Sequence, residues 1–199
     1  MPLTICNDRG VAYAAYAFDF DGTLVDTTDL NHRCVQASLA AHGITVSLGW
    51  VAERPVFTAA QLRRRLGIGA DALPEDSYLT AAQTHWHANT DLLRPIHAGA
   101  SAAREAAERA PVAVVTANYA ALARRALTLV GLDDLPWLIV GREEVPHSKP
   151  APDVYLYAAR QMGVAPGECL AHEDTDEGIS AARAAGMDVI DIRERGWRP

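Results

Sequence analysis

The sequence predicts an α/β fold in which a parallel sheet carries helices on both faces and a small helical module is inserted near the N-terminal end. Short apolar runs alternate with helical stretches from Arg94 onward, which is typical of a parallel sheet covered on both sides. Residues 48–91 instead alternate helical stretches with prolines and glycines. A chain of 199 residues, 49% of them hydrophobic, can form one core with a small additional domain.

The first predicted element is a buried strand in the apolar run Ala12–Phe18, which ends at an acidic loop. A helix follows, capped by Thr27 or Thr28 and ended by Gly43. The later elements are a helix at 100–109, a strand at 112–115, a helix at 119–130, a strand at 137–140, a helix at 152–162, a strand at 169–171, a helix at 178–185 and a strand at 189–192. Right-handed crossovers bring the carboxyl ends of such strands to one edge, where ligands bind. The order of elements therefore predicts a Rossmann-like core with reactive residues directly after its strands.

Composition and charge narrow the possible functions. The formal net charge of −7, without a long basic run, argues against binding to nucleic acid or to an anionic membrane surface. The three cysteines, Cys6, Cys34 and Cys169, form no CxxC pair, so neither a disulfide framework nor a zinc site is expected. No signal peptide or membrane span is expected either. We predict a cytoplasmic protein, a monomer or homodimer, whose partner is a small metabolite.

The stretch Asp19–Thr23 (DFDGT) places two carboxylates two residues apart at the mouth of the first strand. Gly22 permits a tight turn and a close approach of the backbone. Paired carboxylates need a cation or a shared proton, and Mg²⁺ prefers oxygen ligands. One carboxylate can then attack phosphorus while the other moves protons. An ordinary acidic turn is the alternative explanation when this pair is considered alone.

Two further loops could contact a phosphate. Thr116, followed by Ala117 and Asn118, offers a hydroxyl and backbone amides between a strand and a helix, which is typical of phosphate sites but also of an ordinary helix cap. Lys149 lies in a loop stiffened by Pro150 and Pro152 and can neutralise charge on a phosphoryl group. A lone lysine is otherwise usually a solvated surface residue.

An acidic cluster, Glu173–Asp176 (EDTD), follows the fourth predicted strand. Acidic side chains packed together repel one another unless a cation lies between them, although a helix N-terminus also favours acids. Asp174 is therefore our first expected metal ligand and Glu173 the second.

Taken in order, these four elements resemble the four motifs of the haloacid dehalogenase-like (HAD) hydrolase superfamily, and the resemblance extends from about Ala15 to Ile192. The stretches His147–Tyr155 and Glu173–Met187 resemble most the branch that contains β-phosphoglucomutase and sugar-phosphate phosphatases. Within that branch, the second half of the chain is most similar to fructose-1-phosphate phosphatases.

The resemblance implies a role for each motif. Asp19 would be the nucleophile and Asp21 the general acid and base, with Thr116 and Lys149 completing the catalytic set. The phosphate would contact Asp19, Gly22, Thr116, Ala117, Asn118 and Lys149. The Mg²⁺ would be held by Asp19, Asp21, Asp174 and Glu173. Residues 1–27 and 95–199 would form the core domain, and residues 28–94 a helical cap that closes over the substrate. In the cap, Asn31, His32 and Thr58 are the expected substrate contacts.

We therefore predict an Mg²⁺-dependent phosphatase that hydrolyses a small phosphate monoester, expected to be a sugar or sugar-acid phosphate, through an aspartyl-phosphate. A β-phosphoglucomutase-like mutase is the first alternative, and Asn31 disfavours it because the mutases carry a histidine at that position. Carbon–halogen cleavage is disfavoured by Asp21, which that chemistry does not need. A non-catalytic binding protein on the same fold is disfavoured because no member of the catalytic set is missing.

Overall fold

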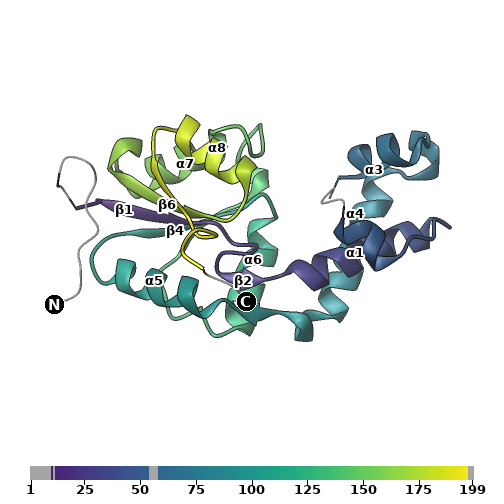
Figure 1. Cartoon of the computed structure of the whole chain (residues 1–199), viewed down its shortest axis with the longest axis horizontal. Coiled ribbons are helices and arrows are strands. Elements are labelled where there is room, and N and C mark those ends of the chain that lie inside the picture. The colour runs from purple at the N-terminus through teal and green to yellow at the C-terminus, as the bar shows by residue number, and fades with distance from the viewer. Residues whose placement is uncertain (1–9, 11, 54–57, 197–199) are drawn as a thin grey trace. The chain divides into compact units, whose positions relative to one another are not determined.

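The computed structural model describes residue 10, residues 12–53 and residues 58–196. The chain divides into two compact units, one containing the residues up to Asp26 and from Arg94 onward, the other Thr27–Leu93 (Figure 1). The domain boundaries predicted from the sequence, after residues 27 and 94, each lie one residue from these divisions. That the second unit closes over a substrate remains a prediction.

A five-stranded parallel sheet forms the centre of the first unit. The strands lie in the order β5-β4-β1-β6-β7, and every neighbouring pair is parallel. Their bounds are β1 Ala15–Phe18, β4 Val112–Val115, β5 Leu138–Val140, β6 Cys169–Glu173 and β7 Asp188–Asp191. All carboxyl ends therefore share one edge of the sheet, with β1 in the middle. The predicted α/β fold with a parallel sheet is confirmed.

Helices cover both faces of this sheet. Their bounds are α5 His97–Ala107, α6 Ala120–Leu129, α7 Asp153–Met162 and α8 Asp176–Ala184. In Figure 1, α7 and α8 lie above the sheet and α5 lies below it. Alternate strand residues such as Ala15, Ala17 and Ala113 share one buried core with Tyr155 and Ala158 of α7. These small strand side chains let α7 pack closely against the central strands.

Most element ends differ from the sequence prediction by one to three residues; for example, β1 begins at Ala15 rather than at residue 12. Helix α5 begins at His97 rather than at residue 100, and β6 continues to Glu173 rather than ending at residue 171. Strand β7 pairs with β6 as far as Asp191 opposite Glu173. Backbone pairing therefore extends β6 through polar residues, which a search for apolar runs does not detect.

A two-stranded antiparallel ribbon was not predicted from the sequence. It pairs β2, Val25–Asp26, with β3, Arg94–Pro95. Strands of two residues are too short to show an alternating pattern. The ribbon joins the positions where the chain leaves the first unit and returns to it. Two short 3-10 turns, η3 Arg142–Glu144 and η4 Pro166–Glu168, complete this unit.

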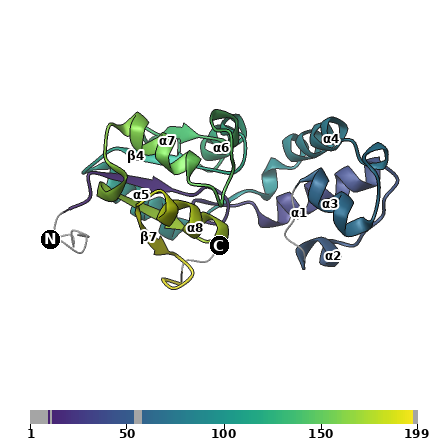
Figure 2. The same ribbon diagram turned by 90° about the horizontal axis from the view of Figure 1, so that it is seen from above.

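The second unit is helical, as predicted. Its elements are α1 Thr28–Ala41, α2 Leu48–Ala52, α3 Ala59–Leu66, η1 Ala70–Ala72, α4 Glu75–Ala88 and η2 Thr90–Leu92. Helix α1 packs along α4 and against α2 (Figure 2). Val35, Leu39, Leu62 and Tyr78 belong to its apolar core. Across the described parts of both units, the longest helices have 14 residues, and none has the length and apolar character needed to cross a membrane.

Candidate active site

Asp19 directly follows the central strand β1 at the carboxyl edge of the sheet. Its backbone amide donates a hydrogen bond to the carbonyl of His172 at 2.9 Å, which holds it beside β6. The residue is only 6% exposed. Burial raises the pKa of Asp19 well above its usual value, and the charge of Glu173 adds to this, while the ammonium of Lys149 opposes it. The sheet thus places a largely buried carboxylate at the edge where ligands bind.

Lys149 is bound to three acceptors. Its Nζ donates to Asp19 Oδ1 at 2.6 Å, to Glu173 Oε1 at 2.5 Å and to the carbonyl of Val115 at 3.0 Å. Burial alone would lower the pKa of Lys149, but the charges of Asp19 and Glu173 outweigh burial and hold this pKa well above its usual value. Three acceptors match the three N–H donors of an ammonium group. Lys149 is therefore a fixed positive charge beside the predicted nucleophile.

The amino-acid composition by itself singles out Lys149, independently of the motif that contains it. Lys149 is the only lysine in a chain with 18 lysines and arginines. Arginine supplies the other 17 of these side chains, yet a planar guanidinium cannot replace a compact ammonium surrounded by three acceptors. The rarity of lysine in this sequence therefore marks this position.

Glu173, the last residue of β6, is fully buried. Its Oε1 also accepts from the Tyr155 hydroxyl at 2.6 Å, and its Oε2 accepts from Thr175 Oγ1 at 3.2 Å. A side chain at Gly178 would overlap this carboxylate, so the glycine in α8 leaves the space that Glu173 occupies. Motif comparison did not identify Tyr155 or Thr175, because a buried aromatic residue and a helix cap have ordinary structural explanations.

Asp174 lies against the turn that follows Asp19. A Cβ at Gly22 would overlap the Asp174 carboxylate, and Gly22 has a φ of +83°. Both features require glycine there. Thr23 Oγ1 donates to Asp174 Oδ1 at 3.5 Å. Burial raises the pKa of Asp174 to about 7, and the charges of Glu173 and Asp21 add to this.

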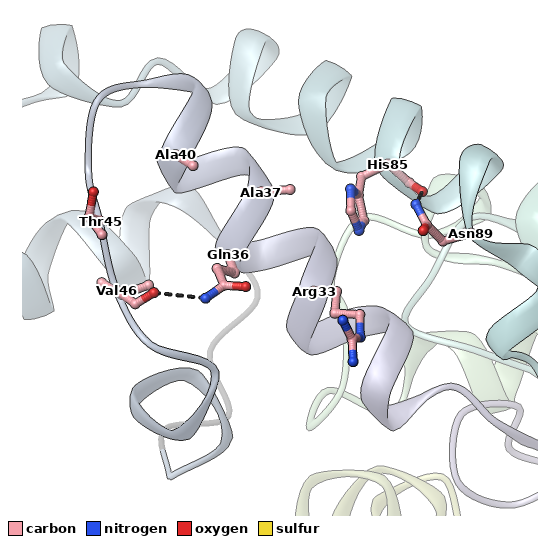
Figure 3. A pocket seen from close by; sticks show the side chains of 8 residues that line it. All are labelled: Arg33, Gln36, Ala37, Ala40, Thr45, Val46, His85 and Asn89. Atoms are coloured by element: carbon pink, nitrogen blue, oxygen red, sulfur yellow. Dashed lines mark hydrogen bonds between the residues drawn. The ribbon is translucent and has the colours of Figure 1, made fainter.

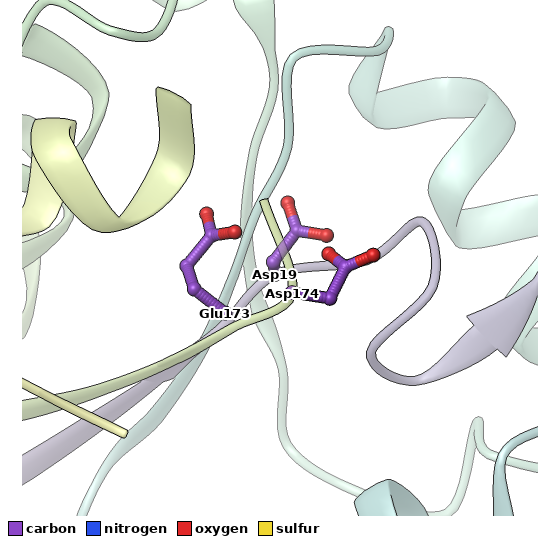
Figure 4. Close-up of side chains that lie close together, drawn as sticks. All are labelled: Asp19, Glu173 and Asp174. Atoms are coloured by element: carbon purple, nitrogen blue, oxygen red, sulfur yellow. The ribbon is translucent and has the colours of Figure 1, made fainter. Parts of the chain in front are cut away.

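Three of these carboxylates could hold a metal ion. Asp19, Glu173 and Asp174 each offer one oxygen, and these oxygens lie within 4.8 Å of one another (Figure 4). The donors are all carboxylate oxygens, which suits a hard cation such as Mg²⁺. Burial is the main cause of the raised pKa values of Asp19 and Asp174, and repulsion among the crowded carboxylates adds to it. A divalent cation would offset that repulsion, so the residues fit the metal that the sequence predicts.

Thr116 and Asp21 meet at the same edge. Thr116 follows β4 and is fully buried, and its hydroxyl donates to Asp21 Oδ2 at 3.4 Å. The same hydroxyl oxygen accepts from the Asn118 amide at 2.9 Å. Ala117 between them is exposed. The amide of Ala120, at the start of α6, donates to Glu143 Oε1 at 2.9 Å. The amides of Asn118 and Ala120 therefore already have protein acceptors, and a phosphate at this loop would have to share them.

The three residues predicted to contact substrate from the cap lie in the second unit. Asn31 and His32 belong to α1, and the Asn31 amide nitrogen donates to Thr27 Oγ1 at 3.0 Å. Thr58 is the N-cap of α3: its hydroxyl oxygen accepts from the Gln61 amide at 3.2 Å, and its own amide donates to Gln61 Oε1 at 3.2 Å. Asn31 and Thr58 thus have local structural roles, and their contact with substrate stays a prediction.

The second unit also contains a cavity of about 270 Å³ between α1, the loop after it and α4 (Figure 3). It is lined by Arg33, Gln36, Ala37, Ala40, Thr45, Val46, His85 and Asn89. A hydrogen bond of 2.8 Å from Gln36 Nε2 to the carbonyl of Val46 closes one side. None of the predicted cap contacts lines this cavity.

Comparison with known proteins finds a matching family and relatives that cover most of the chain. The model of the haloacid dehalogenase-like hydrolases matches residues 16–192. The fructose-1-phosphate phosphatase of Escherichia coli K12 is 33% identical over 184 residues, covering 91% of this chain and 97% of that protein.

Two solved structures are also similar. A HAD family hydrolase from Deinococcus radiodurans, with bound phosphate and sodium, is 27% identical with a TM-score of 0.66, over 89% of this chain and 79% of that chain. CbbY from Rhodobacter sphaeroides, in complex with xylulose-1,5-bisphosphate, is 25% identical with a TM-score of 0.71, over 89% and 84%. The predicted resemblance and the predicted enzyme class, a phosphoric monoester hydrolase, are confirmed by these matches. The chain belongs to the haloacid dehalogenase-like hydrolase family.

Proposed function

We propose that this protein is an Mg²⁺-dependent phosphatase that hydrolyses a small phosphorylated sugar or sugar acid through an aspartyl-phosphate on Asp19. The observation that carries the proposal is the hydrogen bond of 2.6 Å between Lys149 Nζ and Asp19 Oδ1 at the carboxyl end of the central strand. A buried carboxylate held beside a fixed ammonium has few structural purposes, because burying such a pair costs desolvation energy. As a nucleophile with its charge partner, it has a chemical one.

In the first step, a carboxylate oxygen of Asp19 attacks the phosphorus atom, and the bond between phosphorus and the ester oxygen breaks. Asp21 gives its proton to the departing alcohol oxygen. Lys149 stabilises the negative charge on the phosphoryl oxygens and the attacking carboxylate. Support for the role of Asp21 comes from Thr116, whose hydroxyl donates to Asp21 Oδ2 at 3.4 Å and orients it at the same edge.

In the second step, Asp21, now ionised, takes a proton from a water molecule that attacks the phosphorus of the aspartyl-phosphate. The bond between phosphorus and Asp19 breaks, which returns the free carboxylate and releases inorganic phosphate. Asp21 is again protonated and ready for the next substrate. Over the two steps, one ester and one water become one alcohol and one phosphate.

Asp19 and Asp174, with Asp21 and Glu173, are the residues proposed to hold Mg²⁺. Bound there, the ion supplies positive charge that offsets the charge of the phosphoryl oxygens. The proposal is supported by the group of carboxylate oxygens within 4.8 Å and by the raised pKa of Asp174. Glu173 is a weaker candidate metal ligand than Asp174, because both of its carboxylate oxygens already accept hydrogen bonds from protein groups.

A phosphorylated sugar is the proposed class of substrate. The similar E. coli protein is a fructose-1-phosphate phosphatase, and the similar CbbY structure contains a sugar bisphosphate. His32 and Thr58 of the second unit remain proposed substrate contacts, with Asn31. A cytoplasmic location and a monomeric or homodimeric state also stay predictions.

The test is phosphate release from a panel of esters: fructose 1-phosphate, other hexose and hexitol phosphates, phosphoglycolate and a nucleoside monophosphate. Each is assayed with Mg²⁺ and with a chelator. We expect Mg²⁺-dependent release, and a loss of about 1,000-fold or more in Asp19→Asn. Asp29→Asn is the matched control, because Asp29 is an exposed carboxylate paired with Arg33 on α1.

The proposal fails if Asp19→Asn keeps the activity of the unaltered protein. Transfer of phosphate between positions of a sugar without release would instead indicate the mutase. If folded protein neither releases nor transfers phosphate from any ester, the non-catalytic alternative is favoured.

A further inference from the structure

The side chain of Tyr155 contacts both Lys149 and Glu173. Tyr155 is in the first turn of α7 and is fully buried. Its hydroxyl donates to Glu173 Oε1 at 2.6 Å, and the same oxygen accepts from Lys149 Nζ at 2.5 Å. The Lys149 Nζ also lies 5.0 Å from the centre of the Tyr155 ring. One aromatic side chain therefore contacts both members of the buried ion pair.

We propose that Tyr155 is a positioning residue for the reaction, whose hydroxyl orients Glu173 so that Glu173 in turn holds Lys149 at Asp19. This inference deepens the proposed function and rests on it. Because Tyr155 contacts Lys149 and Glu173, we infer that it acts through these residues and is not itself a catalytic group.

The geometry explains why Glu173 needs hydrogen-bond donors in addition to Lys149. A glutamate side chain has three rotatable bonds, and an ion pair with a lysine does not fix its orientation. Tyr155 and Thr175 donate to different oxygens of the carboxylate, at 2.6 Å and 3.2 Å. Two donors from different elements, α7 and the turn before α8, set both the position and the plane of the group.

The position of Glu173 then matters for Lys149. The ammonium has three acceptors, and the other two, Asp19 Oδ1 and the Val115 carbonyl, lie on the ends of β1 and β4. If Glu173 rotates, Nζ loses one of three hydrogen bonds in a site where it is only 6% exposed. The ammonium would then follow Glu173 or bind to a different acceptor, and its distance from Asp19 would change. Small displacements of this kind reduce the rate because a charged group must lie where the transition state develops charge.

The ring of Tyr155 has a separate role, since it belongs to the core shared by α7 and the sheet. Phenylalanine would fill the same space and keep the ring beside Lys149. Tyr155→Phe therefore removes the hydroxyl and little else. Tyr157→Phe is the matched control, because Tyr157 lies on the same helix, is partly buried and contacts Arg160.

The first measurement is steady-state kinetics with the best ester of the panel. We expect Tyr155→Phe to lower kcat by about 10- to 100-fold, the effect of losing one hydrogen bond to a charged group, and to leave KM within about twofold. Tyr157→Phe should leave both values unchanged. A kcat of Tyr155→Phe equal to that of Tyr157→Phe would overturn the proposal.

The second measurement does not depend on activity. Because the chain has one lysine, protein labelled with ¹⁵N-lysine gives one side-chain ammonium resonance. We expect this resonance to shift, or to weaken through faster proton exchange, in Tyr155→Phe and to remain in place in Tyr157→Phe. An unchanged resonance in Tyr155→Phe would show that the hydroxyl does not position Lys149. If the unaltered protein releases no phosphate, the proposed function fails, and the resonance still decides whether Tyr155 holds Lys149. Thermal unfolding of both variants verifies that each is folded.

Discussion

At the carboxyl edge of the sheet, polar side chains join residues that are far apart in the sequence, whereas two of the predicted substrate residues of the helical unit, Asn31 and Thr58, bond to close neighbours. Lys149 and Asp19 are 130 positions apart, and Thr116 and Asp21 are 95 apart. In the unit of residues 27–93, Asn31 bonds to a residue four positions away, and Thr58 to one three positions away.

Long-range and local hydrogen bonds differ in how strongly they indicate a functional site. Long-range bonds among buried charges form only in the folded chain, and their desolvation must be offset, so they point to a function at the edge of the sheet. Bonds over three or four residues stabilise the start of a helix in any protein. A substrate role for Asn31 or Thr58 therefore needs support beyond their geometry.

The largest expected effect comes from removing the charge of Lys149. In Lys149→Met, Asp19 and Glu173 lose their shared partner, so we expect kcat to fall about 1,000-fold or more and the free energy of unfolding to fall by about 3–5 kcal/mol. Arg33→Met in α1 removes one member of the exposed pair with Asp29, which is worth about 0.5 kcal/mol or less. Urea denaturation and phosphate release measure both variants. Similar losses in the two variants would contradict the proposed difference between the two regions.

Substitutions at two glycines with positive φ can distinguish the effect of backbone strain from the effect of contact with the site. Gly22 has a φ of +83° and faces the Asp174 carboxylate, while Gly43 has a φ of +74° and open space beside it. Alanine at either position should cost about 1–2 kcal/mol of folding free energy. Only Gly22→Ala should also lower activity, by about 100-fold, since its methyl group displaces Asp174 from the metal-binding group.

Denaturation midpoints and kcat of the two alanine variants check this pair. Equal activity in Gly22→Ala and Gly43→Ala would mean that the position of Asp174 does not matter for the reaction.

Variants of Thr58 test whether this residue of the helical unit has only a local structural role. Thr58→Ala should lower the free energy of unfolding by about 1 kcal/mol, because α3 loses its N-cap, and Thr58→Ser should keep the N-cap and the stability. Thermal unfolding measures this change. A rise in KM in the alanine variant that the serine variant reverses would support the predicted contact with substrate. An unchanged KM would mean that Thr58 serves only as the N-cap of α3.

The smallest difference is expected between two cysteines, one in each unit. Burial raises the pKa of Cys34 to about 12 and that of Cys169, next to the charge of Glu168, to about 11. A raised pKa keeps the thiol protonated, so at pH 8 the thiolate fraction should fall by roughly 1,000-fold and 100-fold from that of an ordinary cysteine. Iodoacetamide labelling followed by peptide mass spectrometry should find both slow in folded protein and fast in urea. Rapid labelling of Cys34 alone would show that the helical unit opens independently.

Much of the fold followed from the sequence because its signals are local. Apolar runs predicted the strands within a few residues, and glycines and prolines marked the turns between helices. The acidic pair after β1 and the acids at the end of β6 were also visible in the sequence, since each group falls within a few residues of the chain. The error at the end of β6 and the unpredicted ribbon of β2 and β3 arise where backbone pairing rather than side-chain pattern decides the element.

By itself, the sequence determined that the chain forms a parallel α/β sheet with a helical insertion, and it predicted that the reactive residues follow the strands. Only the tertiary structure decided that Lys149 has Asp19, Glu173 and the Val115 carbonyl as acceptors, and that the Tyr155 hydroxyl donates to Glu173. The physical reason is that periodicity and turn chemistry act over a few residues, whereas the partners of a buried charge depend on strand order and helix packing. Tyr155 looks like any core aromatic residue in the sequence, and its hydroxyl gains a role only when α7 packs against the end of β6.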